Sequence, residues 1–157
     1  MKLVLICVGR MSQRHLQEGV EEFTTRLRRY LPLELIELKE EKAGKKPDVD
    51  RVRDREGLRI LEKIPARGPV IVLDERGRGL DSAGMARLVE KEMLSGTEYL
   101  TWIIGGPYGL SDQVRKRADR ILSLSEMTFP HQMVRLILAE QLYRAMTIIR
   151  REPYHHS

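Results

Sequence analysis

The chain has 157 residues, of which 41% are hydrophobic and 32% charged, and its formal net charge is +5. This length and balance predict one folded domain over residues 1–157 and exclude disordered and fibrous classes, and no apolar run approaches the roughly 18 residues that a membrane-spanning helix needs. The single cysteine excludes an internal disulfide and favours a reducing compartment, so the cytoplasm is the expected location and no membrane is expected as a partner.

Apolar runs typical of buried strands alternate with stretches of helical periodicity along the whole chain. Apolar side chains recur every three or four residues from Leu16 to Tyr30, for example, before Pro32 ends the expected helix. Such alternation predicts an α/β fold with a mostly parallel sheet and helices on both faces. A charged segment at residues 39–48 predicts an exposed loop. The expected strands cover residues 3–8, 33–38, 70–73, 99–104 and 121–124. The expected helices cover residues 16–30, 49–64, 82–95, 112–117 and 131–151.

Three expected turns, at residues 73–77, 105–109 and 124–131, follow strands and therefore lie at the carboxyl edge of the sheet, where such folds bind ligands. The glycines of the second turn allow backbone to approach a ligand closely, although an ordinary tight turn explains them equally well. This turn matches neither the dinucleotide-binding pattern nor a P-loop. The small polar and apolar residues of the third turn suit an adenine. Together the three turns indicate a site for a nucleoside-like ligand.

The last helix and the tail after it carry the charged and aromatic candidates. Glu140 and Arg144 are four residues apart, which favours an intrahelical ion pair over a substrate contact. The tail at residues 150–157 combines arginines, Tyr154 and histidines, which can hold phosphate and stack on an unpaired base. A frayed terminus or a tag remnant is the ordinary alternative. The net positive charge favours an anionic partner, but many domains without one carry a similar excess.

Other common chemistries find no support in the residue spacing. His15 and His131 are isolated from other potential ligands, so no metal is expected. Cys7 lies within an expected strand, which favours a buried core side chain over a nucleophile. No Ser-His-Asp arrangement can be recognised.

The chain resembles the large-subunit ribosomal RNA methyltransferase H family of the SPOUT superfamily. The resemblance rests on several separate motifs, which are spread over the whole chain in the order expected for that family. They are Met1-Lys2-Leu3 with Val8-Gly9, Leu73-Asp74-Glu75-Arg76-Gly77 with Leu80 and Ser82, Ile104 to Gly109, Leu122 to Ser125, Met127-Thr128, Pro130-His131, Val134-Arg135, Glu140 to Ala145 and Pro153-Tyr154-His155.

The resemblance implies methyl transfer from S-adenosylmethionine to N3 of a pseudouridine in a hairpin loop of 23S rRNA, on the assembled ribosome. It also implies a homodimer and a trefoil knot near the C-terminus, which is a rare exception to ordinary chain topology. The cofactor residues that it implies are Leu73, Gly105, Leu124, Ser125, Glu126, Met127, Thr128 and Phe129.

A direct displacement at the imide nitrogen requires a group that accepts its proton. Within this resemblance the candidate acceptors are His155 and Glu140, with Tyr154 orienting or stacking the base, and with Arg135 and Arg144 balancing charge. The family is expected to carry a basic residue directly after the Tyr-His pair of the tail. Here His156 stands at that place, and a histidine is mostly uncharged near neutral pH.

Three other functions remain open on the sequence alone. A non-catalytic ribosome- or RNA-binding protein would need no cofactor. A flavodoxin-like enzyme acting on a small molecule would bind a phosphorylated cofactor and would not need the basic tail. A methyltransferase acting on tRNA would keep the chemistry and change the target.

Overall fold

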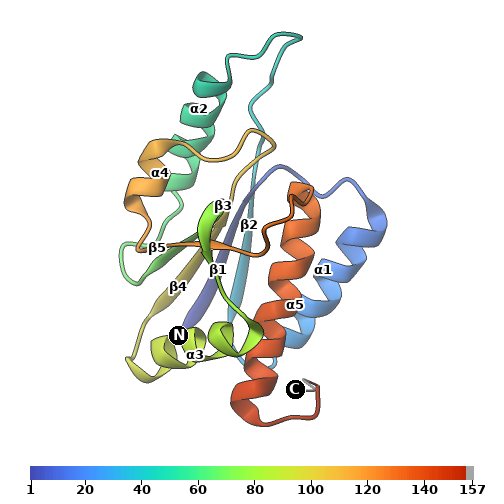
Figure 1. The fold of residues 1–157 in the computed structure, drawn as a ribbon, viewed down its shortest axis with the longest axis vertical. Coiled ribbons are helices and arrows are strands. Elements are labelled where there is room, and N and C mark those ends of the chain that lie inside the picture. The colour runs from blue at the N-terminus through green and yellow to red at the C-terminus, as the bar shows by residue number, and fades with distance from the viewer. Residues whose placement is uncertain (155–157) are drawn as a thin grey trace.

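The computed structural model describes residues 1–154, which form one sheet covered by helices (Figure 1). All strand pairs within these residues are parallel, and the strand order is β2-β1-β4-β3-β5. The prediction of an α/β fold with a mostly parallel sheet is therefore confirmed. The strands are β1 (Lys2–Val8), β2 (Leu33–Leu38), β3 (Val70–Gly79), β4 (Tyr99–Ile104) and β5 (Arg120–Ser123). The helices are α1 (Arg14–Leu27), α2 (Val49–Leu61), α3 (Ser82–Leu94), α4 (Asp112–Arg117) and α5 (His131–Arg150).

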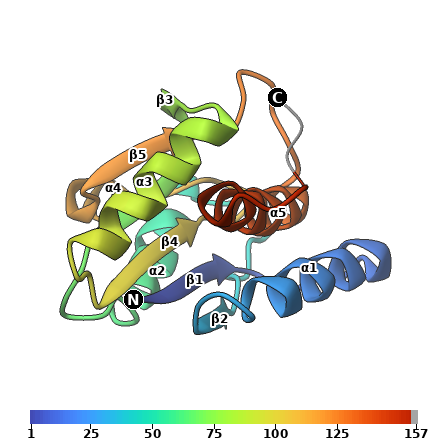
Figure 2. The same ribbon diagram turned by 90° about the horizontal axis from the view of Figure 1, so that it is seen from below.

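The helices form two layers because alternate side chains of each buried strand face opposite sides of the sheet. Leu3 and Leu5 share a core with α1, α3 and α5, whereas Val4 and Ile6 share a core with α2 and α4. Figure 2 shows α5 between α1 and α3, and both of these helices contact it. None of the helices in residues 1–154 combines the length and the apolar character needed to cross a membrane. Cys7 lies in the first core and is 1% exposed, which confirms its expected role as a core residue.

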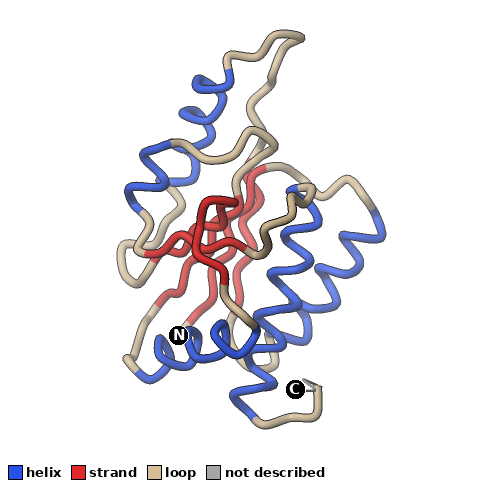
Figure 3. The backbone as a smooth tube through the Cα atoms, viewed as in Figure 1, coloured by secondary structure: helices blue, strands red, loops and turns tan. Residues whose placement is uncertain are grey.

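One expected turn is wrong. β3 does not end at Leu73 but continues to Gly79, with a register shift along β5 between Leu73 and Arg78 (Figure 3). Gly77 makes this possible, since a Cβ atom there would lie 2.4 Å from the carbonyl carbon of Leu122. Without a side chain, the β3 backbone can pass directly over β5. The irregular stretch of β3 thus becomes part of the carboxyl edge of the sheet.

Candidate functional site

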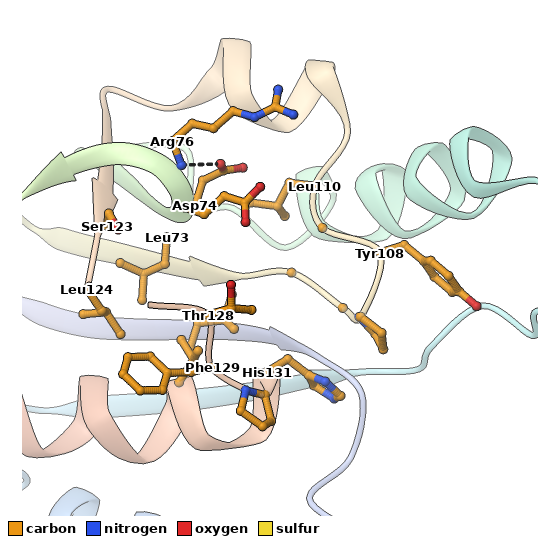
Figure 4. Close-up of a pocket in the computed structure, with 18 of the residues that line it drawn as sticks. Leu73, Asp74, Arg76, Tyr108, Leu110, Ser123, Leu124, Thr128, Phe129 and His131 are labelled. Atoms are coloured by element: carbon orange, nitrogen blue, oxygen red, sulfur yellow. Dashed lines mark hydrogen bonds between the residues drawn. The ribbon is translucent and has the colours of Figure 1, made fainter. Parts of the chain in front are cut away.

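A cavity of about 640 Å³ opens at the carboxyl ends of β3, β4 and β5 (Figure 4). Its size is typical of sites for small organic ligands and cofactors. It lies at the edge where the sequence predicts a ligand site. The walls come from α2, the end of β3, the loop after β4, α4, and the segment that leads into α5. The lining residues are Arg53, Leu73 to Arg76, Ile104 to Leu110, Arg115, Ser123 to Ser125, Met127 to His131 and Val134.

The glycine-rich loop after β4 folds back on itself and presents backbone to the cavity. The N–H of Gly109 donates to the carbonyl of Gly106 at 3.0 Å, and Gly109 has a φ of +83°, which favours glycine. A Cβ atom at Gly105 would lie 2.9 Å from the Leu110 side chain and 3.1 Å from the Gly109 carbonyl oxygen. Position 105 therefore has no room for a side chain, as expected where backbone lines a ligand site.

An ion pair between β3 and α4 fixes a second wall. The Arg115 guanidinium lies 2.8 Å from Asp74 and also donates to the carbonyl of Leu110 at 2.7 Å. Burial alone would raise the pKa of Asp74, but the backbone N–H of Arg76 and the Arg115 guanidinium together lower it below its ordinary value. Asp74 is therefore a carboxylate at neutral pH and not a proton donor.

The segment before α5 forms the third wall through local hydrogen bonds. The Ser123 hydroxyl donates to the carbonyl of Ser125 at 2.7 Å, and the N–H of Met127 donates to the Ser125 hydroxyl at 3.0 Å. Of the predicted cofactor residues, all line the cavity except Glu126. In Figure 4 the side chains of Leu73 and Phe129 lie on one side of the cavity, so an apolar surface faces the glycine-rich loop.

Three of the predicted catalytic residues lie together, but they do not line this cavity. Arg144 Nε donates to Glu140 at 2.9 Å, which confirms the intrahelical ion pair, and the Tyr154 hydroxyl donates to the same carboxylate oxygen at 3.1 Å. The Arg144 guanidinium also lies over the Tyr154 ring, 4.7 Å from its centroid. Burial and the Glu140 carboxylate raise the pKa of Tyr154. The fourth candidate, His155, lies outside the described residues.

Arg135, the fifth catalytic candidate, is buried against two strands. Its side chain is 2% exposed and donates to the carbonyls of Val8 and Gly9, at 2.5 and 2.7 Å, and to Glu37 at 2.9 Å. These contacts join α5 to the carboxyl ends of β1 and β2. Its hydrogen bonds go to backbone carbonyls and Glu37, and it does not line the cavity. In this structure Arg135 therefore connects α5 to β1 and β2, and its expected role in balancing charge stays a prediction.

His131, which the sequence did not single out as a site residue, lines the cavity at the first turn of α5. Its Nε2 atom lies 3.4 Å from the Glu40 carboxylate, which is an electrostatic contact longer than a good hydrogen bond. Burial lowers the pKa of His131, so its imidazole is neutral at pH 7. The sequence signal that could have identified His131 as a site residue is its position directly after the 124–130 segment. Within residues 1–154, no group of three or more His, Cys, Asp or Glu side chains is placed to hold a metal ion.

Comparison with known proteins places this arrangement in a family. Residues 1–155 match the family model described as "Predicted SPOUT methyltransferase". The ribosomal RNA large subunit methyltransferase H of Syntrophotalea carbinolica is 58% identical over 99% of both chains. That of Trichlorobacter lovleyi is 47% identical over 99% of this chain and all of its own. A solved structure of a probable methylase family protein from Haemophilus influenzae, 12% identical, shares the fold with a TM-score of 0.52, covering 95% of this chain and 66% of its own. The chain therefore belongs to the SPOUT methyltransferases, in the family of ribosomal RNA large subunit methyltransferase H.

Proposed function

We propose that the chain transfers a methyl group from S-adenosylmethionine to N3 of a pseudouridine in a hairpin loop of 23S rRNA, on the assembled ribosome. The observation that carries this proposal is the cavity at the carboxyl edge of the sheet, whose walls contain all but one of the expected cofactor residues. The relatives, which are named as methyltransferases of the large-subunit ribosomal RNA, support the substrate class.

The cavity suits S-adenosylmethionine in size and in chemistry. Leu73, Leu124 and Phe129 offer apolar surface to an adenine ring, and the backbone at Gly105 can approach a nucleoside because this residue has no side chain. Bound there, the cofactor supplies a methyl group on a positively charged sulfur. The protein's contribution is to hold that group in line with the attacking nitrogen, and such positioning supplies much of an enzyme's rate.

The target imide must give up its proton when the methyl group arrives. Glu140 is a poor acceptor in this chain, because its carboxylate already takes hydrogen bonds from Arg144, Gln141 and Tyr154. His155 is therefore the proposed acceptor, with Tyr154 stacking on or orienting the base and Arg144 balancing charge. Replacing His155 with Ala should lower turnover about 100-fold or more and leave S-adenosylmethionine affinity unchanged. The same change at His15, which is exposed on α1, is the control, and equal turnover in both variants would remove the assignment.

We further propose a homodimer as the working form. Glu140, Arg144 and Tyr154 do not line the cavity of their own chain, and Met133 on α5 is 36% exposed. A second copy on α5 would bring the tail of one chain to the cavity of the other. Mixed dimers of a His155→Ala chain and a Gly105→Val chain should then recover activity that neither variant has alone. A fully active monomer in sedimentation would contradict the proposal.

The trefoil knot near the C-terminus and the cytoplasmic location are further proposals, supported by family membership. An enzyme that acts on assembled ribosomes must be located with them in the cytoplasm.

The experiment that tests the proposed function combines two measurements. Titration calorimetry should show micromolar binding of S-adenosylmethionine and no binding of flavin or nucleoside triphosphates. The protein should then transfer a radiolabelled methyl group from S-adenosylmethionine to ribosomes isolated from bacteria that lack the family's enzyme. Ribosome binding without cofactor binding would favour a non-catalytic RNA-binding protein. Methylation of tRNA alone would show that the substrate is tRNA and not ribosomal RNA.

A further inference from the structure

The connection between β2 and α2 starts and ends at the rim of the cavity. Glu40, at its start, faces His131, and Arg53, in the first turns of α2, lines the cavity and donates to the carbonyl of Tyr108 at 2.6 Å. Between these two anchors the chain stands out from the body of the molecule, beyond the carboxyl edge of the sheet, at the top of Figure 1. The segment is therefore attached at the site but extends away from it.

The acidic side chains of this segment are engaged with neighbouring groups. Glu41 forms ion pairs with Arg55, at 2.6 Å, and with Arg59, and the two guanidinium groups lower its pKa. Asp48 accepts a hydrogen bond from the backbone N–H of Arg51, 3.1 Å away, and so caps α2. The backbone N–H of Glu41 also donates to the buried Glu56 at 2.9 Å, which fixes the base of the segment against α2.

The basic side chains of the same segment are in a different position. Lys42, Lys45, Lys46 and Arg51 are all exposed, and none of them takes part in an ion pair within residues 1–154. We call these four residues the basic arm. The fold pairs the Glu41 carboxylate with arginines of α2, whereas Asp48 and Asp50 stay exposed and the four cations have no ion-pair partner within residues 1–154. The result is a group of exposed positive charges on a segment that is attached at the rim of the cavity and extends away from it.

We propose that the basic arm binds the phosphate backbone of the ribosomal RNA next to the hairpin loop whose base enters the cavity. This inference rests on the proposed function. Lysines act as point charges that neutralise phosphates without reading sequence, and each contact releases condensed counterions. Side chains cannot read the deep major groove of an RNA helix, so backbone contacts of this kind suit a stem that flanks an unpaired target loop.

The test is a triple variant, K42Q/K45Q/K46Q, compared with a matched triple, K63Q/K91Q/K116Q. The control lysines are also exposed and lie in the segments that lead into the amino ends of β3, β4 and β5, at the opposite edge of the sheet. Both variants lose the same charge. Cofactor affinity, measured by calorimetry, should be unchanged in both, because neither set of lysines lines the cavity.

Ribosome binding is measured by sedimentation at a series of potassium chloride concentrations, and methylation by steady-state kinetics on unmodified ribosomes. The arm variant should raise KM by about tenfold or more at unchanged kcat, and should reduce the slope of log affinity against log salt by about 2. The control variant should match the wild type. Equal effects of the two variants, or a wild-type salt slope in the arm variant, would overturn the proposal.

Photo-crosslinking from position 45 then identifies the partner. A crosslink to 23S rRNA is expected, and a crosslink only to a ribosomal protein would overturn the RNA assignment. Because sedimentation and crosslinking do not depend on methyl transfer, they test RNA binding by the arm even if the wild type proves to methylate nothing. A wild type that methylates while the arm variant behaves normally would sink the inference and leave the proposed function standing.

Discussion

The Asp74 carboxylate and the Arg115 guanidinium, 2.8 Å apart, join the irregular end of β3 to α4 across one wall of the cavity. Arg115 also donates to the carbonyl of Leu110, the residue that closes the glycine-rich loop. One side chain thus connects two of the three walls that were expected to hold the cofactor. We expect the shape of the cavity to depend on this ion pair, which positions the walls and takes no part in methyl transfer.

Replacing Arg115 with Ala should therefore weaken S-adenosylmethionine binding about tenfold or more and lower the free energy of unfolding by about 2 kcal/mol, since hydrogen bonds to charged groups are each worth about 1.5–3 kcal/mol. Calorimetric titration and urea unfolding measure the two quantities. Arg117→Ala, on the same helix but exposed and 3.5 Å from Asp119, should change stability by less than about 0.5 kcal/mol. Normal cofactor affinity in the Arg115 variant would show that the wall does not depend on the pair.

Two glycines of β3 provide a sharp comparison. A Cβ atom at Gly77 would lie between 2.4 and 2.7 Å from backbone atoms of Leu122, whereas a Cβ atom at Gly79 meets nothing within 4 Å. Gly77→Ala should destabilise the protein by roughly 2 kcal/mol or more, because the backbone of one strand must move. Gly79→Ala should be nearly neutral. Thermal unfolding of the two variants decides this, and equal melting temperatures would contradict the packing described for β3.

The sequence predicted the sheet and the position of the site but not the path of β3. Apolar runs such as Leu3 to Val8 identify buried strands because parallel strands are covered on both faces. The motif at residues 73–77 contains charged residues and a glycine, which are typical of a turn, and only contact with Leu122 makes it a strand. Local composition cannot show such a contact between distant segments.

The roles of single charged residues were also hidden, for a related reason. Arg135 and Arg144 lie on one helix with similar sequence surroundings, yet one is buried against the carbonyl of Val8 and the other binds Glu140. The difference depends on which neighbouring element each residue faces. Spacing within the helix revealed the Glu140 pair, because both partners are on α5. It could not reveal a partner on β1, more than a hundred residues away in the chain.

Arg135→Met should destabilise the fold by about 3 kcal/mol or more, because the change removes the buried guanidinium that donates to the carbonyls of Val8 and Gly9 and to the Glu37 carboxylate. Arg135→Lys should recover only part of the loss, since an ammonium group cannot reproduce the forked contacts of a guanidinium. Arg150→Met, at the exposed end of α5, is the control. Chemical denaturation provides the measurement. An Arg135→Met protein of normal stability but low turnover would instead support the expected role in balancing charge.

The neutral imidazole of His131 should make stability depend on pH in a defined direction. Burial lowers its pKa and Arg135 lowers it further, while the Glu40 carboxylate partly opposes both. Above about pH 7.5 the group is almost fully neutral in the folded and unfolded chain alike, so it contributes no pH dependence there. As the pH falls below about 6.5, the unfolded chain takes up the proton first, and the folded state loses stability until the pH reaches the lower pKa of the folded protein.

His131→Gln should consequently lose less stability than the wild type between about pH 7.5 and about pH 5.5, because the variant has no imidazole to protonate. Urea unfolding at the two pH values measures the difference, and His15→Gln, at an exposed histidine on α1, should behave like the wild type. Cofactor affinity in the wild type should fall only as the pH approaches the lowered pKa of the folded protein, since only then does an imidazolium in the cavity wall repel the positively charged sulfonium. If His131→Gln and the wild type change in parallel, the imidazole is not held neutral by its surroundings.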